Sequence, residues 1–349
     1  MLAPLFLSLL LAVPVQAESL GNENPLQIEA SMKQFLATKI GPGLTPMQRL
    51  QSLVNAIFLD PDLKFAYAPV SRSAGETFES RDGNCLSFTL MFLSMARHLN
   101  LDARFCEVKL SPLFTRKGEF VILNQHLKPV VVIAGEAYAI DIFPGIIPVG
   151  LNGQIVSDRR GLAHYFSNKG VDELGNGSFA LAEAYFKKAI DTDASTAGAW
   201  LNLGTARYRA GKMDEAERFY RKALALNPKN MAAMSNLASI CEMTGKLKEA
   251  TRLKKRIQQF REKNPYYHYA LGSQSFLEGH YDEALVHYKR AIKLNATDHT
   301  FYLALAQMYA RLGKKNETAA NLQLAEKFAS DPANKLRYAQ KLEMLEGMN

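Results

Sequence analysis

Cys85 has the surroundings of a cysteine nucleophile. It precedes a long apolar run, Leu86 to about Leu99, whose pattern predicts a helix with Cys85 in its first turn. In that turn, unpaired backbone N–H groups and the positive end of the helix dipole stabilise a thiolate. Such a thiolate attacks carbonyl carbon atoms near neutral pH when a base stands beside it.

The predicted domain offers two histidines as this base, His98 and His126. His98 lies 13 residues along the same helix, about 20 Å from Cys85, and is therefore out of reach. His126 begins an apolar strand that turns at Ala134-Gly135-Glu136 and returns through a strand carrying Asp141. A hairpin there places residues 126 and 141 opposite or diagonal to each other, so that a carboxylate can orient the imidazole.

The same region predicts the elements that must hold these residues. Two helical patterns, Pro25–Thr38 and Pro46–Phe58, come first, and Thr45 is a good N-cap for the second. Four β-rich runs follow the cysteine helix, at 103–109, 119–123, 129–133 and 137–143. Helices followed by an antiparallel sheet form an α+β layout.

The stretch Gly83 to Phe105 resembles the transglutaminase-like superfamily. The papain-related core of that family has Cys on a helix preceded by Gly, an Ala-Arg-x-x-Gly-Leu segment, and then His and Asp on adjacent strands. The resemblance covers roughly residues 50–150 and implies a papain-like/transglutaminase-like α+β core. It also implies catalytic roles for Cys85, His126 and Asp141.

This sequence departs from the family pattern at two places. Asn100 stands where Gly is usual, a change that a left-handed backbone tolerates. Leu127-Lys128 follow His126 where an aromatic residue is frequent. Neither departure removes a reacting group. The family resemblance implies a thioester intermediate and one of several outcomes: acyl transfer to an amine, deamidation, or amide or peptide hydrolysis. Some family members catalyse no reaction.

Glycines recur every 34 residues in the C-terminal half. They are Gly177, Gly211, Gly245, Gly279 and Gly313, and alanines keep the same phase. Each unit has two apolar helical patterns with Gly at the turn, where it accepts the left-handed backbone that ends a helix. The pattern resembles the tetratricopeptide repeat, with five repeats over residues 163–332 and a capping helix over 333–349. It predicts an all-α solenoid.

The repeat resemblance implies a protein or peptide partner, because ligands of this family usually lie against the concave face made by first helices. The matching positions are Tyr208, Arg209, Ser239, Tyr266, Tyr269, Phe276 and Arg311. The alternative for each aromatic is that it packs between repeats. Eight Lys/Arg between Lys246 and Lys263 lie mostly on a second helix, so a solvated outer face is favoured over a nucleic-acid or membrane site.

The first 17 residues have the pattern of a signal peptide. The run Leu2–Val15 is almost entirely apolar, shorter than a membrane span, and small residues follow it up to Ala17. We therefore expect cleavage near Ala17 and export to the periplasm or the medium. An uncleaved anchor or a buried N-terminal helix is the alternative. No other run reaches spanning length, so no stable membrane insertion is expected.

Composition and charge add further limits. The chain of 349 residues is 48% hydrophobic and 22% charged, which excludes overall disorder. Lys+Arg and Asp+Glu number 14 each up to residue 163, and 28 against 20 after it, so the net charge of +8 lies in the repeats. Three cysteines exclude a four-Cys zinc site. No cofactor or metal is expected, and the sequence says nothing of the oligomeric state.

Two hypotheses follow for a mature protein with a transglutaminase-like domain at 18–162 and repeats after it. In the first, the protein is an exported cysteine-dependent acyl transferase or amide/peptide hydrolase, and the repeats recruit its partner. In the second, it is a non-catalytic adaptor. A bond between Cys85 and Cys106 in an oxidising compartment would block the nucleophile, and it stays as a further alternative.

Overall fold

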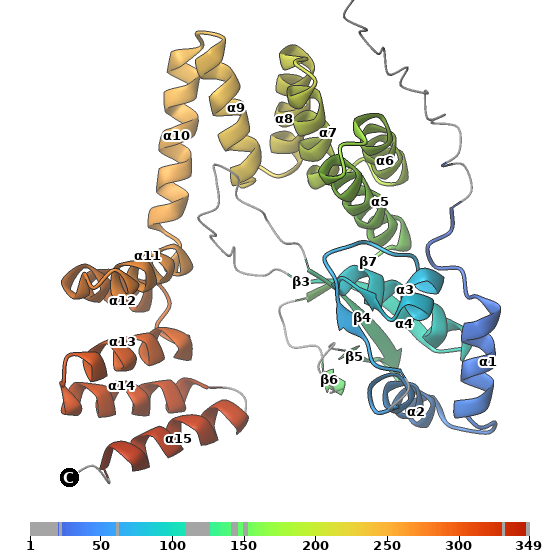
Figure 1. Cartoon of the computed structure of the whole chain (residues 1–349), viewed down its shortest axis with the longest axis horizontal. Coiled ribbons are helices and arrows are strands. Elements are labelled where there is room, and N and C mark those ends of the chain that lie inside the picture. The colour runs from blue at the N-terminus through green and yellow to red at the C-terminus, as the bar shows by residue number, and fades with distance from the viewer. Residues whose placement is uncertain are drawn as a thin grey trace, which may run out of the picture. The chain divides into compact units, whose positions relative to one another are not determined.

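The computed structural model describes residues 20, 23–60, 63–108, 126–140, 146–148, 153–329 and 332–346 (Figure 1). The chain divides into two compact units. The first comprises residues 1–109 with 125–233, and the second comprises residues 110–124 with 234–349. The division at Ala233 falls inside helix α9 (Met231–Met243), so it does not coincide with a boundary between elements.

Four helices open the first unit: α1 (Ala30–Lys39), α2 (Pro46–Phe58), α3 (Ala74–Ser80) and α4 (Cys85–His98). The predicted start of α2 is confirmed. The Thr45 hydroxyl accepts the backbone N–H of Gln48, whose side chain returns to the Thr45 N–H. This reciprocal pair satisfies two of the N–H groups that a helix start leaves without partners. Helix α3 was not predicted, although Ser73 and Glu76 cap it in the same way.

The predicted antiparallel sheet is confirmed, with strand order β6-β5-β4-β3-β7. Its strands are β3 (Asp102–Val108), β4 (His126–Ile133), β5 (Glu136–Ile140), β6 (Ile146–Pro148) and β7 (Gly153–Val156). The turn between β4 and β5 has Ala134 and Gly135 at φ of 52° and 87°. Such a turn matches the twist of a hairpin. The predicted run 119–123 lies outside the described residues.

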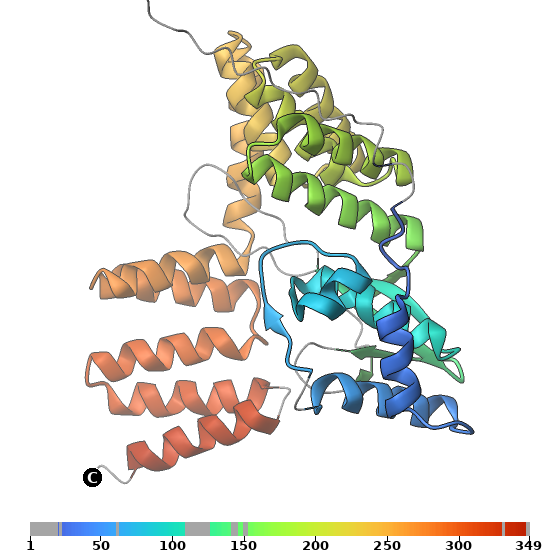
Figure 2. The same cartoon turned by 45° about the vertical axis from the view of Figure 1, so that its right-hand side comes forward.

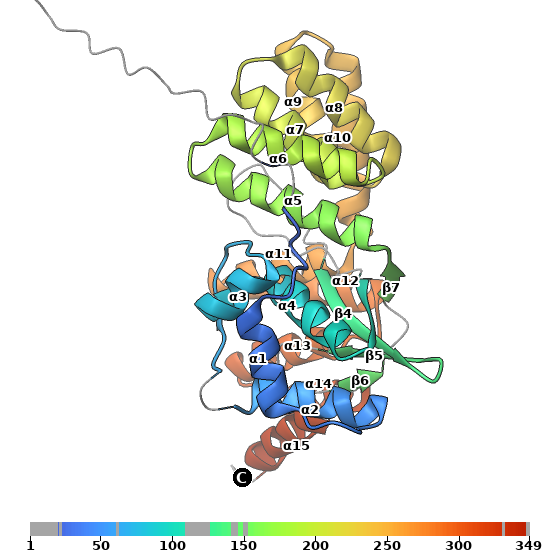
Figure 3. The same ribbon diagram turned by 90° about the vertical axis from the view of Figure 1, so that its right-hand side faces the viewer.

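Helix α4 is the centre of this unit. Every residue from Leu86 to Ala96 is buried, because α4 lies between α1 and the strands β3 and β4 (Figure 3). A helix that is apolar on all sides has to be buried in this way. Asn100, just after α4, has φ of 55°, which confirms the left-handed position expected where the family has Gly.

The C-terminal half is a run of helices, α5 to α15. Besides α9 they are α5 (Asp158–Gly175), α6 (Phe179–Thr192), α7 (Ala197–Arg209), α8 (Met213–Leu226), α10 (Leu247–Glu262), α11 (Pro265–Leu277), α12 (Tyr281–Leu294), α13 (His299–Arg311), α14 (Lys315–Phe328) and α15 (Pro332–Glu346). Within the second unit, α11 to α14 form antiparallel pairs (orange to red in Figure 2). An α+β core followed by an all-α solenoid is the fold class that the sequence predicts, and it is confirmed.

The five periodic glycines have the backbone role that their spacing predicts. All have positive φ, between 71° and 82°. In every case the residue after the glycine donates its N–H to the carbonyl oxygen five residues back, as Lys212 does to Arg207 at 2.9 Å. This bond closes the first helix of each pair and satisfies one of its last carbonyl groups. A residue with a Cβ would strain the backbone at these five turns.

The core of the first unit continues beyond residue 162 into the repeats. Tyr165 and Phe166 on α5 are almost fully buried and pack in the same cluster as Phe92 on α4 and Phe105 on β3. The Tyr165 hydroxyl donates a 2.6 Å hydrogen bond to Glu23 near the N-terminus. The predicted boundaries at 162 and 332 stay predictions, but the first repeat helix shares its core with the domain before it.

On α15, the side chain of Tyr338 is completely buried. The Tyr338 hydroxyl lies 2.8 Å from Nδ1 of His299 on α13. Such contacts suit a helix that covers the last apolar face of an array. Among the described residues, no helix combines the length and the apolar character that a membrane crossing requires.

A truncation tests the shared core. We expect residues 18–162 alone to unfold at a lower temperature than residues 18–233, because the shorter fragment lacks Tyr165 and Phe166. Removing one buried aromatic side chain costs roughly 3–5 kcal/mol. Thermal unfolding followed by circular dichroism compares the two fragments. Equal midpoints would mean that α5 contributes nothing to the core of the first unit.

Candidate functional site

The structure places Cys85 where the sequence predicts it, as the first residue of α4. The residue is half-buried. Asn84 is the N-cap, and its side-chain oxygen accepts the backbone N–H groups of Leu86 and Ser87, both at 3.0 Å. The first turn of α4 is therefore held firmly, with Cys85 at its positive end.

Residues 70–72 form a loop that is joined to this turn by several hydrogen bonds. The Asn84 N–H donates to the Val70 carbonyl at 3.2 Å. The Asn84 side-chain amide donates to the Ser71 hydroxyl at 3.0 Å, and the Arg72 N–H donates to the Ser87 hydroxyl at 2.8 Å. Ser71 and Ser87 are buried. The loop thus closes one side of the site.

Two short strands, β1 (Ala66–Tyr67) and β2 (Asp82–Gly83), lead into this arrangement as a parallel pair. Gly83 has φ of 154°, and a Cβ there would come within 2.7 Å of the Ser87 Cβ. The position therefore requires Gly, because a side chain would push the first turn of α4 away. Tyr67, opposite Gly83 in the pair, is 72% exposed.

Strand β4 begins at His126, which pairs with Val108 in the register with β3. Thr89, one turn after Cys85, connects α4 to this strand. Its buried hydroxyl lies 2.8 Å from the Cys85 carbonyl oxygen and 3.1 Å from the Leu127 carbonyl oxygen, so its single proton is shared between these two acceptors. The backbone next to His126 is therefore fixed to the turn that carries Cys85. Asp141 lies outside the described residues.

The roles of Ser71, Asn84, Ser87 and Thr89 were not predicted from the sequence. Asn84 could have been found, because Asn directly before an apolar helical run is a strong N-cap signal. Ser71 and Thr89 gain their roles from contacts with distant parts of the chain, for which a single sequence carries no signal.

The structure does not join Cys85 to Cys106 by a disulfide bond. Cys106 lies on β3 and is buried, and burial raises the pKa of its thiol. Cys241 on α9 is also buried. Burial in apolar surroundings makes a thiol less reactive, so Cys85 is the most accessible of the three.

A buried polar cluster lies where β3 meets the first repeat. Arg160 on α5 lies 3.6 Å from Glu107 on β3 and 3.7 Å from Asp193 after α6. His164 is 9% exposed, and its Nε2 has no hydrogen-bond partner and lies 3.8 Å from Glu107. Burial, and then the charge of Arg160, lower the pKa of His164 to about 4. The Glu107 carboxylate is too far from His164 Nε2 for a hydrogen bond that would stabilise the protonated ring, so the effect of burial on the pKa prevails.

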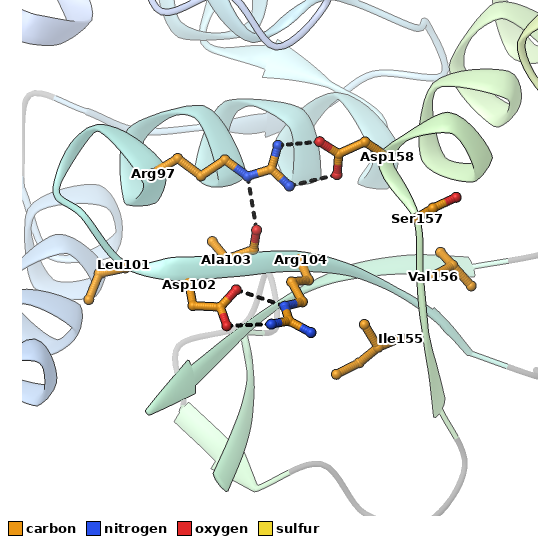
Figure 4. A pocket seen from close by; sticks show the side chains of 9 residues that line it. All are labelled: Arg97, Leu101, Asp102, Ala103, Arg104, Ile155, Val156, Ser157 and Asp158. Carbon is orange, nitrogen blue, oxygen red and sulfur yellow. Dashed lines mark hydrogen bonds and ion pairs between the residues drawn. The ribbon is translucent and has the colours of Figure 1, made fainter. Parts of the chain in front are cut away.

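A shallow cavity of about 550 Å³ lies at the opposite end of α4 (Figure 4). Arg97 donates two 2.7 Å bonds to Asp158, and Arg104 is held by Asp102 in the same way. An anionic ligand would have to break one of these ion pairs. Twelve residues of α4, about 18 Å, separate Arg97 from Cys85, so the cavity is no part of the candidate site.

The predicted partner-binding residues lie on four helices, α7, α9, α11 and α13, and in both units. In the first unit, Tyr208 is half-buried and Arg209 is exposed at the end of α7. In the second unit, Ser239 on α9 is half-buried, and Arg311 is exposed at the end of α13.

The three predicted aromatics of α11 are partly buried and pack within the second unit. The Tyr266 ring lies 5.3 Å from that of Phe301, and its hydroxyl donates to Asp298. Tyr269 and Phe276 pack against the core between α12 and α13. These contacts correspond to the packing alternative. The partner-binding role of all seven positions stays a prediction.

Among the described residues, no group of three or more His, Cys, Asp or Glu side chains is placed to hold a metal ion. A half-buried thiol thus stands at the start of α4, and strand β4, which packs against α4, begins at His126, whose side chain lies outside the described part of the structure.

Comparisons with known families agree with this arrangement. The transglutaminase-like superfamily matches residues 34–135. Three tetratricopeptide-repeat families match residues 168–230, 207–273 and 274–313. Both predicted resemblances are thereby confirmed, in the predicted order. No curated protein sequence matches the chain.

Solved structures with similarity to the chain include three repeat-containing proteins. YrrB, described as a TPR protein with an unusual peptide-binding site, is 21% identical and has a TM-score of 0.28, over 52% of this chain and 92% of its own. MamA of AMB-1 is 22% identical (TM-score 0.26; 50% and 97%). PilF of Pseudomonas aeruginosa is 19% identical (TM-score 0.29; 54% and 87%).

The lowered pKa of His164 gives a pH prediction. Between pH 6.5 and about 4 the unfolded chain binds a proton at this residue and the folded chain does not. The free energy of unfolding should therefore fall as the pH is lowered, by about 2 kcal/mol from pH 7 to pH 5. His164→Gln should lose this component of the slope.

Denaturant unfolding at both pH values measures this difference. His98→Gln is the control, because His98 is exposed at the end of α4. The same slope in His164→Gln and in the unchanged protein would show that His164 does not stay neutral in the folded state.

Proposed function

We propose that this chain, which carries a transglutaminase-like domain at residues 34–135 and tetratricopeptide repeats at residues 168–313, is an exported cysteine-dependent acyl transferase or amide/peptide hydrolase. The observation that carries the proposal is the position of Cys85, half-buried at the capped start of α4, with the backbone at His126 fixed to the same turn through Thr89.

In the proposed reaction, the Cys85 thiolate attacks the carbonyl carbon of an amide, and His126 as imidazolium gives its proton to the departing amine. The result is a thioester on Cys85. His126, now neutral, takes a proton from water or from a second amine, which attacks the thioester and releases the thiolate. Water as acceptor gives hydrolysis, and an amine gives acyl transfer.

The oxyanion that forms in each step needs a hydrogen-bond donor. We assign the role to the backbone N–H of Cys85 itself, because the N–H of the nucleophile stands closest to the attacked carbonyl group.

Asp141 is proposed to orient the imidazole of His126. The register of β4 with β5 pairs Val130 with Ala139 and Val132 with Ala137. Continued by one more pair on the same face, that register predicts Asp141 opposite Lys128 and diagonal to His126. A carboxylate at this diagonal position can accept a hydrogen bond from the ring nitrogen of His126 that does not face the Cys85 thiol.

The repeats are proposed to recruit the protein or peptide that carries the amide. Stacked helix pairs of this family form extended binding surfaces and contain no reacting group of their own. Arg209 and Arg311 are exposed at the ends of α7 and α13, and arginine is one of the residue types enriched where proteins bind each other.

Export is part of the proposal. The apolar run Leu2–Val15 supports it, together with the small residues up to Ala17. Cleavage after Ala17 would keep Glu23, whose carboxylate accepts the hydrogen bond from Tyr165. The mature protein would then act in the periplasm or outside the cell.

Thiol alkylation tests the proposal without knowledge of the substrate. Iodoacetamide should modify Cys85 quickly well below pH 8.5, about the pKa of an ordinary cysteine. His126→Ala should move the pH profile toward that value, because the imidazolium no longer stabilises the thiolate. Asp141→Asn should have a smaller effect, because the carboxylate acts on the orientation of the ring.

His98→Ala is the matched control, since His98 is exposed at the last position of α4 and should leave the profile unchanged. Mass spectrometry of the modified peptides assigns the rates to Cys85. A profile like that of an ordinary thiol, unaffected by His126→Ala, would favour the adaptor hypothesis, in which the transglutaminase-like domain only binds.

A further inference from the structure

A series of hydrogen bonds joins the first repeat helix to the residue before Cys85. On α5, the Asp172 carboxylate accepts the backbone N–H of Ser71 at 2.8 Å. The Ser71 hydroxyl in turn accepts a hydrogen bond from the side-chain amide of Asn84 at 3.0 Å. The other end of the Asn84 side chain caps α4 at Leu86 and Ser87.

The chemistry of these groups fixes the direction of every bond. The backbone N–H groups of Leu86 and Ser87 can only donate, so the Asn84 side-chain oxygen must face the helix and its nitrogen must face the Ser71 hydroxyl, which accepts. Ser71 is 1% exposed, so water cannot replace a missing partner. The Asp172 carboxylate, which accepts the Ser71 N–H, therefore holds in place the residue whose hydroxyl accepts the Asn84 amide.

The same helix, α5, is also tied to the far end of α4. Asp158, the first residue of α5, holds Arg97 in the last turn of α4 through two 2.7 Å bonds. Asp172 lies about 21 Å further along α5. Thus α5 runs antiparallel to α4. Its first residue binds the last turn of α4 directly, and Asp172 near its other end is linked to the start of α4 through Ser71 and Asn84.

We propose that Asp172 is a positioning residue for Cys85, acting through Ser71 and Asn84, so that the first repeat helix controls how firmly the nucleophile is held. This inference rests on the proposed role of Cys85 as nucleophile. Loss of the carboxylate leaves the Ser71 N–H without an acceptor, so that the loop no longer holds the Ser71 hydroxyl firmly against the Asn84 amide. The first turn of α4 then loosens, and its N–H groups stabilise the thiolate less well.

Two measurements on the full chain test this. In Asp172→Ala, alkylation of Cys85 by iodoacetamide at pH 6 should be about tenfold slower, as a shift of one unit in the pH profile requires. Hydrogen exchange of the backbone N–H groups of Leu86 and Ser87 should be faster in the same variant. Asp172→Asn keeps an oxygen that can accept the Ser71 N–H but removes the negative charge, so its alkylation rate should lie between those of Asp172→Ala and the unchanged protein.

A double variant tests whether the residues act as one series. Ser71→Ala should slow alkylation as Asp172→Ala does, and the combination should be no slower than either alone, because both break the same path. Asp158→Asn is the matched control. It removes a carboxylate of the same helix that binds α4 at the other end, and it should leave both the pH profile and the exchange at Leu86 and Ser87 unchanged.

The outcomes separate this inference from the proposed function. If Cys85 of the unchanged protein is alkylated like an ordinary thiol, the proposed function fails. Hydrogen exchange at Leu86 and Ser87 then shows by itself whether Asp172 stabilises the first turn of α4. If the unchanged protein responds to His126→Ala but not to Asp172→Ala, the proposed function stands and Asp172 is no positioning residue. Faster exchange with an unchanged alkylation profile would likewise reduce Asp172 to a structural role.

Discussion

The start of α4 is the constraint on which the first unit depends. A helix buried over its whole length from Leu86 to Ala96 can bring a reactive side chain to the surface only at its ends. Its first N–H groups need partners wherever water is excluded. Asn84 provides them, and the buried loop 70–72 holds Asn84. The exposure of Cys85 and the stability of α4 therefore rest on the same few hydrogen bonds.

Helix α5 joins the two kinds of architecture. Tandem repeats are nearly one-dimensional, since each contacts only its neighbours. The first repeat is an exception here, because its helix α5 buries Tyr165 and Phe166 in the core of the transglutaminase-like domain. The polar cluster of Arg160, Glu107 and His164 lies along the same contact. The first repeat thus serves as a part of the domain that precedes it.

The sequence could predict what short-range chemistry determines. Glycines 34 residues apart predicted the turns with positive φ, and Thr45-Pro46 predicted the start of α2. Contacts between distant residues could not be predicted. Ser71 and Asp172 stand 101 positions apart, and the parallel pair β1–β2 has no local pattern. Strand β4 begins at His126, as the sequence predicts, and its pairing with β3 continues through Pro129, a residue that usually argues against a strand.

The shared core changes what a bound partner could do. A ligand on an ordinary repeat array affects its neighbours through small shifts that fade from one repeat to the next. Along α5, by contrast, a displacement would act on both ends of α4 at once, since Asp158 binds Arg97 of α4 directly and Asp172 is linked to the N-cap residue Asn84 through Ser71. Packed interiors do not deform gradually. A partner that moved α5 far enough to break the cap at Asn84 would therefore change the surroundings of the Cys85 thiol. A smaller movement would leave the cap and the thiol as they are.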